Sequence, residues 1–104
     1  MFYDADSVDI IAVRKDGGIE LLIISTGKFD DSKEQQDLLL DKVNNYIEYL
    51  NSDEFNEDYP GIDNKWIIVS YNRKPTLFLN TLFKKIEMIV KNEGINFELK
   101  RRLL

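Results

Sequence analysis

Four polar residues in two loops are the side chains of this sequence best suited to bind an anion: Lys28, Arg73, Lys74 and Thr76. Lys28 follows one predicted strand just before a predicted helix, and the other three lie between the end of a later strand and the first turn of the next predicted helix. The carboxyl ends of parallel strands meet at one edge of an open α/β sheet, where helix N-termini offer free N–H groups. If these strands run parallel, the four residues form a site for a phosphate-like anion. The alternative is that they are loop residues with solvated charges.

The segment Thr26-Gly27-Lys28 is similar to the end of a phosphate-binding P-loop, whose full signature is GxxxxGK[ST]. The first glycine of that signature is replaced by Leu22, and the hydroxyl residue that would hold Mg²⁺ is replaced by Phe29. The sequence therefore has no P-loop, and an anion site here must use another geometry.

Histidine and cysteine are both absent from the sequence. Their absence excludes disulfide bonds, thiolate nucleophiles, Cys/His zinc sites and Ser-His-Asp triads within this chain. Catalysis would have to use carboxylates, amines, hydroxyls or a residue of another subunit. We therefore predict no catalytic residue and no cofactor, and a non-enzymatic function is favoured.

Two carboxylates, Asp9 and Glu20, could face each other across a predicted hairpin. Such pairs bind Mg²⁺ or act as acid and base. The metal-dependent nucleases with Asp and Glu-x-Lys on adjacent strands need a lysine two residues after the glutamate, and here Leu22 occupies that position. We therefore predict no metal site and interpret both carboxylates as ordinary strand residues.

An acidic segment with interleaved aromatic rings follows the first predicted helix; it comprises Asp53, Glu54, Phe55, Glu57, Asp58 and Tyr59. It lacks the regular spacing of an EF-hand calcium loop. Carboxylates with aromatic neighbours suit a basic protein partner, because charge steers the encounter and aromatic side chains anchor the complex. We predict a partner-binding loop here. The alternative is a solvated loop that only keeps the protein soluble.

The charge of the chain is divided between an acidic middle and a basic end. Residues 30–63 contain eleven Asp/Glu and only two lysines, a net of −9, whereas residues 64–104 carry nine Lys/Arg against three Glu, a net of +6. The whole chain has a net charge of −5, so general affinity for the phosphate backbone of a nucleic acid is not expected. Faces of opposite charge instead favour a protein partner, which includes a second copy of the chain.

The length of 104 residues suits a single domain over residues 1–104. The longest apolar runs have four residues, whereas a membrane-spanning helix needs about twenty. The N-terminal segment has no basic region followed by a long apolar stretch, so no secretory signal is expected. We predict a cytoplasmic protein that does not associate with membranes.

Hydrophobic periodicity and turn residues predict a ββαβαβ order of elements. A hairpin is expected at Asp16-Gly17-Gly18, and Gly94 is expected to end the second helix. The fold class is therefore α/β (α+β): a two-layer sandwich of two helices and a four-stranded mixed sheet. The predicted elements are strands over residues 7–14 and 19–25, a helix over 32–51, a strand over 65–71, a helix over 75–93 and a strand over 95–100.

The first three predicted strands are apolar on both faces; in the second, Leu22 and Ile24 alternate with Leu21 and Ile23. If both helices lie on one face, the other face exposes an apolar patch larger than monomers normally tolerate. We therefore predict a homodimer in which a symmetry mate covers this sheet face. The competing arrangement places one helix on each face and needs no dimer.

Several segments together resemble a family of small bacterial proteins of unknown function: Val8-Asp-Ile-Ile-Ala-Val, the Asp16-Gly17-Gly18 turn, Leu21-Leu-Ile-Ile-Ser, the helix over 37–50 and Tyr59-Pro60. The resemblance covers nearly the whole chain and implies a single α/β domain in a bacterial cytoplasm. It carries over no catalytic residue. The family pattern often has a histidine near the start of the first helix, where this chain has Gln35-Gln36, and this departure argues against shared histidine chemistry.

The leading hypothesis is a non-enzymatic interaction domain whose acidic helix and following loop bind a positively charged protein. The alternative is a domain, enzymatic or not, that binds a small anionic ligand such as phosphate or a nucleotide. A third hypothesis is a purely structural subunit.

Overall fold

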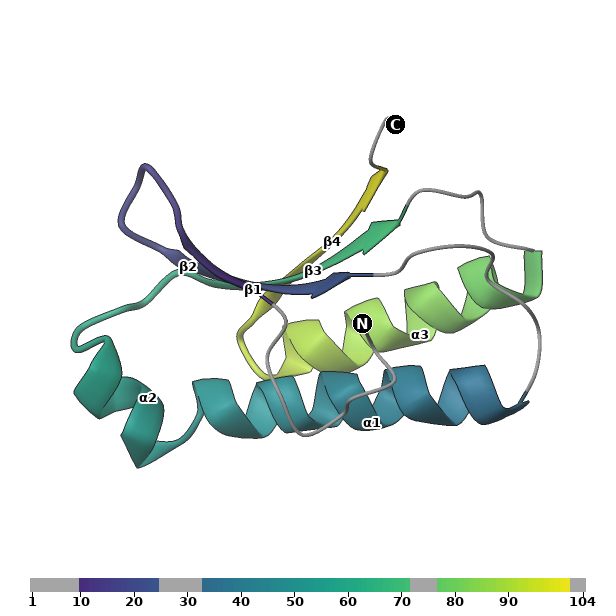
Figure 1. Cartoon of the computed structure of the whole chain (residues 1–104), viewed down its shortest axis with the longest axis horizontal. Coiled ribbons are helices and arrows are strands. Elements are labelled where there is room, and N and C mark those ends of the chain that lie inside the picture. The colour runs from purple at the N-terminus through teal and green to yellow at the C-terminus, as the bar shows by residue number, and fades with distance from the viewer. Residues whose placement is uncertain (1–9, 25–32, 72–76, 102–104) are drawn as a thin grey trace.

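Four strands form one sheet in the order β1-β2-β3-β4 in the computed structural model, which describes residues 10–24, 33–71 and 77–101. Strand β2 pairs antiparallel with β1 and parallel with β3, and β3 pairs parallel with β4, so the sheet is mixed as predicted. The elements, shown in Figure 1, are β1 (Ile10–Val13), β2 (Ile19–Ile24), α1 (Lys33–Leu50), α2 (Asp53–Asp58), β3 (Lys65–Tyr71), α3 (Leu77–Asn92) and β4 (Asn96–Arg101).

Helices α1 and α3 lie on the same face of the sheet (Figure 1). Helix α3 packs mainly against β4, and α1 contacts both α3 and β3. The predicted two-layer sandwich is confirmed, and the competing arrangement with one helix on each face is wrong. The predicted ββαβαβ order is also confirmed, with the short helix α2 as an addition.

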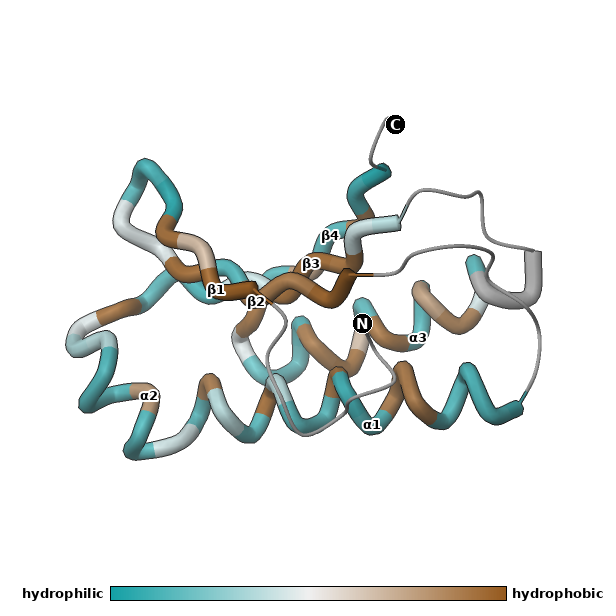
Figure 2. Tube along the Cα trace, viewed as in Figure 1, coloured by the Kyte–Doolittle hydropathy of each residue, from teal (hydrophilic) through white to brown (hydrophobic). Residues whose placement is uncertain are grey.

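The core lies between the sheet and the two long helices, where the apolar stripes of Figure 2 face each other. Leu21 is opposite Ile67, and Ile67 is opposite Phe97, so alternate residues of three strands point to the helices. The residues expected on the apolar face of α3 include Leu82, Phe83, Ile86, Ile89 and Val90, and among these five only Ile89 is exposed, at 43%. The buried helical residues include Leu39, Val43, Tyr46, Leu50, Phe83, Ile86 and Val90.

Two glycines adopt the positive φ that their turns require. Gly17 has φ +89° in the hairpin, where its N–H donates to the Arg14 carbonyl over 3.0 Å. Gly94 has φ +72° after α3, and its N–H donates to Lys91 while the next N–H, from Ile95, donates to Val90. This pair of bonds is a Schellman motif, which satisfies carbonyls at the helix end. The predicted helix end at Gly94 is therefore confirmed.

The segment after α1 is a helix rather than the predicted loop. Ser52 ends the preceding turn and begins α2, because its hydroxyl accepts a 3.1 Å hydrogen bond from the Phe55 N–H. Asp53 and Glu54 then lie in the first turn, where negative charge is stabilised by the helix dipole. The acidic composition that indicated a loop is therefore also suited to a helix start.

The sheet face opposite the helices is less exposed than the sequence suggested. Ile68 points to this face, since it is opposite Leu22 and alternates with Ile67, yet it is only 2% exposed. Among the described large apolar side chains of this face, only Ile10 is exposed, at 46%. The bare patch on which the sheet-face dimer depended is not found in this part of the chain, and that dimer stays a prediction.

Candidate functional site

The four residues of the predicted anion site, Lys28, Arg73, Lys74 and Thr76, lie outside the described residues. The strands that lead to them are adjacent and parallel, with Ile24 at the end of β2 opposite Ser70 near the end of β3. The two strands therefore run parallel, as the predicted anion site requires. The site itself stays a prediction.

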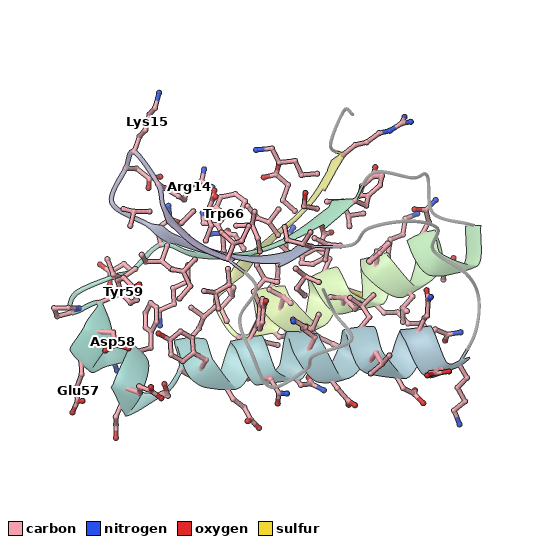
Figure 3. The ribbon with its side chains drawn as sticks, viewed as in Figure 1. Arg14, Lys15, Glu57, Asp58, Tyr59 and Trp66 are labelled. Carbon is pink, nitrogen blue, oxygen red and sulfur yellow. The ribbon has the colours of Figure 1, made fainter. Side chains whose placement is uncertain are left out.

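The predicted partner-binding segment presents its carboxylates on the outside of α2. Asp53, Glu54, Glu57 and Asp58 are all exposed, and Tyr59 is half-buried. Figure 3 shows Glu57 pointing away from the body of the molecule. These carboxylates therefore have the accessibility that a partner-binding role requires.

Phe55 corrects the sequence interpretation, because it is fully buried rather than available to a partner. Its ring makes an edge contact with Tyr49 and a tilted contact with Tyr59, both at 5.4 Å between centroids. Such aromatic pairs add stability beyond the area they bury. Phe55 thus anchors α2 to the core, and it holds the acidic helix in a fixed position.

The acidic surface extends from α2 along the exposed side of α1. Four carboxylates of α1 recur at spacings of three, four and seven residues, which places them on one stripe of the helix. We call these and the four of α2 the acidic face. Its members are Glu34, Asp37, Asp41, Glu48, Asp53, Glu54, Glu57 and Asp58. Within the described ranges, none of the eight forms an ion pair with a lysine or arginine.

The two lysines of the acidic segment differ in their environment. Lys33, at the start of α1, is exposed, whereas Lys42 has no exposed surface. The Lys42 Nζ lies 5.8 Å from the centroid of the Tyr46 ring, and the Tyr46 hydroxyl donates to the Leu22 carbonyl over 2.9 Å. Because Lys42 is buried, it presents no accessible positive charge on the acidic face.

The pKa of Tyr49 is raised by burial and by the nearby carboxylates of the acidic face. Burial raises the pKa of its phenol above 10.0, and the nearby negative charge of Asp58 raises it further. The hydroxyl donates to Asp58 Oδ2 over 3.4 Å. Tyr59 and Glu54 add smaller effects in the same direction on this pKa.

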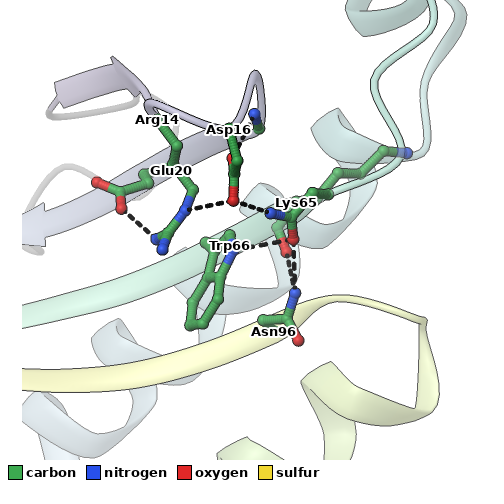
Figure 4. A network of polar contacts seen from close by, with 8 residues as sticks. Arg14, Asp16, Glu20, Lys65, Trp66 and Asn96 are labelled. Atoms are coloured by element: carbon green, nitrogen blue, oxygen red, sulfur yellow. Dashed lines mark hydrogen bonds and ion pairs between the residues drawn. The ribbon is translucent and has the colours of Figure 1, made fainter.

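A second polar cluster lies on the opposite side of the sheet from the helices (Figures 3 and 4). The guanidinium carbon of Arg14 stands 4.2 Å from the centroid of the Trp66 ring, and its Nη1 donates to Glu20. The predicted pairing of Glu20 with Asp9 cannot be followed, because Asp9 lies outside the described residues. Glu20 instead forms an ion pair with Arg14, which is a structural role.

Asn64 joins three strands within this cluster (Figure 4). Its Oδ1 accepts hydrogen bonds of 3.0 Å from Trp66 Nε1 and Asn96 Nδ2, while its Nδ2 donates to Asp16 over 2.9 Å. The same residue's carbonyl accepts from the Ile19 N–H over 2.9 Å. These hydrogen bonds tie the hairpin to β3 and β4, so the cluster is a structural network rather than a reactive site. The sequence analysis missed Asn64 and Asn96.

A groove of about 550 Å³ runs between α3 and the edge strand β4. Its lining is partly apolar, from Phe83, Phe97 and Leu99, and partly charged, from Lys84 and Glu87. This groove is the best candidate for a contact surface outside the acidic face.

The described residues contain no cluster of three or more carboxylates arranged to hold a metal ion. None of their helices is long and apolar enough to cross a membrane.

A model of DUF6572, a family of unknown function, matches residues 1–102 of the chain. No curated protein and no solved structure matches it.

Proposed function

The chain belongs to the DUF6572 family of unknown function, and from that premise we propose that it is a non-enzymatic protein-interaction domain whose acidic face binds a basic protein. The observation that carries this proposal is the set of eight exposed carboxylates on α1 and α2 without an ion pair in the part of the chain described. Like charges held together on a rigid surface are unfavourable for the free protein, and a cationic partner relieves that repulsion.

The anchoring of α2 supports the proposal further. Phe55 is buried, and the Ser52 cap fixes the start of the helix, so the carboxylates are held in place before a partner arrives. A preorganised surface loses less conformational entropy on binding than a flexible loop would. The acidic face is therefore better suited to a specific partner than the predicted loop.

The test compares two variants with equal charge change in a pull-down from a lysate of the source cells. Glu48→Lys with Glu57→Lys reverses one exposed carboxylate on each helix of the acidic face. Asp63→Lys with Glu93→Lys reverses two exposed carboxylates outside it. We expect partners retained by the wild-type protein to be lost from the first variant, kept by the second and released by salt. Identical partner sets for all three proteins would refute the proposal.

The parallel pairing of β2 with β3 favours the anionic-ligand alternative. In that case Lys28, Arg73, Lys74 and Thr76 bind a phosphate-bearing metabolite, and a thermal-shift screen of phosphorylated compounds provides the test. A ligand that binds only the native state must raise the apparent melting temperature, and the rise must disappear in Arg73→Ala with Lys74→Ala.

A further inference from the structure

Strand β4 is the last strand of the sheet, and no other strand in the described part of the chain pairs with its outer edge. Among the described residues, no backbone hydrogen bond outside the helices and ladders involves residues 96–101. An open edge of this kind is a template for pairing with another strand. We propose that β4 pairs antiparallel with β4 of a second copy of this chain, which joins the two sheets across a twofold axis. This proposal does not depend on the acidic face.

The charges of β4 select one register for this pairing. In an antiparallel pair, hydrogen-bonded pairs of opposite residues alternate with non-hydrogen-bonded pairs, and the two residues of a pair are always of the same kind. Neighbouring residues of a strand are of different kinds, so the twofold axis must pass between a residue and its own copy. An axis at Glu98 places Glu98 opposite itself, and an axis at Lys100 places two ammonium groups together. An axis at Leu99 places Glu98 opposite Lys100 of the second copy, twice. Like charges directly opposite destabilise a sheet, whereas opposite charges stabilise it.

Both Glu98 and Lys100 are exposed, and they point to the sheet face that the helices leave open, because β4 residues alternate with buried Phe97. The two cross-strand ion pairs would therefore form on an accessible surface. An isologous contact requires a surface that is complementary to itself. Strand β4 meets this requirement, because Glu98 and Lys100 of one copy pair with Lys100 and Glu98 of an antiparallel copy.

The other face of β4 fits the same register. Phe97 and Leu99 point toward the helices, since they lie opposite Ile67 and Val69. In the proposed pair Leu99 meets Leu99 of the second copy, and Phe97 faces Arg101 of the second copy, which allows a cation–π contact. Leu99 also lines the groove of about 550 Å³ between α3 and β4. In this register the second strand lies along the open side of the groove and covers half-buried Leu99.

The opposite edge of the sheet lacks these features. Strand β1 has the sequence Ile-Ile-Ala-Val and carries no charge that could select a register. Its exposed side chains Ile10, Ile11 and Val13 mark it only as apolar. Of the two sheet edges, only β4 therefore carries charges that favour one register with a second copy of the same strand.

The experiment is sedimentation equilibrium of the full chain at about 100 µM. The wild-type protein is expected at twice its 12.2 kDa mass. Glu98→Lys alone and Lys100→Glu alone each place like charges opposite each other twice, so the association constant should fall about tenfold or more. An equal mixture of these two variants restores both opposite-charge pairs. We therefore expect the mixture to form a dimer although each variant alone is weakened.

Glu93→Lys and Lys85→Glu make the same charge changes at exposed positions outside β4, and both are expected to associate as the wild type does. Circular dichroism of every variant confirms that the chain is folded. A wild-type protein that sediments at 12.2 kDa would overturn the proposal and leave the edge to a different partner. A dimer that survives Glu98→Lys, or that is abolished by Val13→Lys on β1, would also overturn it. So would a mixture that stays monomeric.

Discussion

The ammonium group of Lys65, at the start of β3, donates a 2.8 Å hydrogen bond to the carbonyl of Leu50, the last residue of α1. The same Nζ lies 5.2 Å from the centroid of the Phe55 ring in α2. Helix α1 has no basic residue in its own last turn, so a lysine from the sheet supplies the positive charge that its C-terminus favours. One side chain therefore joins the sheet to both helices that carry the acidic face.

Replacing Lys65 with methionine should lower the free energy of unfolding by about 1–2 kcal/mol, because the carbonyl loses its donor while the aliphatic packing is kept. Urea denaturation followed by circular dichroism measures the change. Lys84→Met, at an exposed position of α3, is the control and should change stability by no more than about 0.5 kcal/mol. Equal effects of the two substitutions would mean that the contact with Leu50 contributes nothing.

Phe55→Ala should destabilise the protein by about 3–4 kcal/mol, because it removes a fully buried aromatic side chain from the core. Phe55→Leu fills part of the same volume and should cost less. Met88→Ala, at a side chain that is 70% exposed, provides the control and should have little effect. A Phe55→Ala protein of unchanged stability would support the earlier interpretation of Phe55 as a partner contact.

Phe55 was predicted to lie in a partner-binding loop, but the structure buries it in a short helix, and this difference shows which helices the sequence could predict. The long helices were predictable because their apolar residues recur at helical spacing over several turns, as at Leu39, Val43 and Tyr46. Helix α2 has only six residues, too few to show a period, and its acidic composition is shared by loops. The one local signal for α2 was Ser52, a residue type that favours a helix start. The Ser52 hydroxyl accepts a hydrogen bond from the N–H of Phe55, three residues later.

The polar network around Asn64 could not have been predicted for a different reason. Asn64 and Asn96 are 32 residues apart, and they meet only because β3 and β4 are neighbours in the sheet. Strand order is decided by packing of the whole domain, and no local pattern encodes it. The charge pairing proposed for β4 likewise depends on its place at the edge of the sheet.

Gly18→Ala should destabilise the hairpin by about 1–3 kcal/mol, since a Cβ there would lie 2.6 Å from the carbonyl oxygen of Asn64. That oxygen already accepts from the Ile19 N–H, so the strands must separate to admit the methyl group. Thermal unfolding gives the loss. Gly94→Asn is the comparison, because its position has open space and asparagine tolerates the required φ of +72°. A larger loss at Gly94 than at Gly18 would contradict the crowding argument.

Alkaline titration should locate the pKa of Tyr49 above that of an unperturbed tyrosine. Since the folded-state pKa is raised above the unfolded value of 10.0, the related stability is fully present below pH 10 and is lost as the pH rises through the folded pKa. Asp58→Asn removes a neighbouring charge and should bring the pKa of Tyr49 down toward 10.0. The ultraviolet absorbance of tyrosinate, compared with that of Tyr49→Phe, isolates this residue among the five tyrosines.

Glu57→Gln is the matched control for that titration, because Glu57 belongs to the same exposed helix but is not among the groups that raise the pKa of Tyr49. It should leave the pKa of Tyr49 nearly unchanged, since screening by water weakens the effect of an exposed charge that makes no contact. Equal decreases for the two variants would assign the raised pKa to the general charge of the acidic face. A decrease confined to Asp58→Asn would establish the direct contact between Tyr49 and Asp58, and with it the fixed position of α2 on which the proposed partner-binding surface depends.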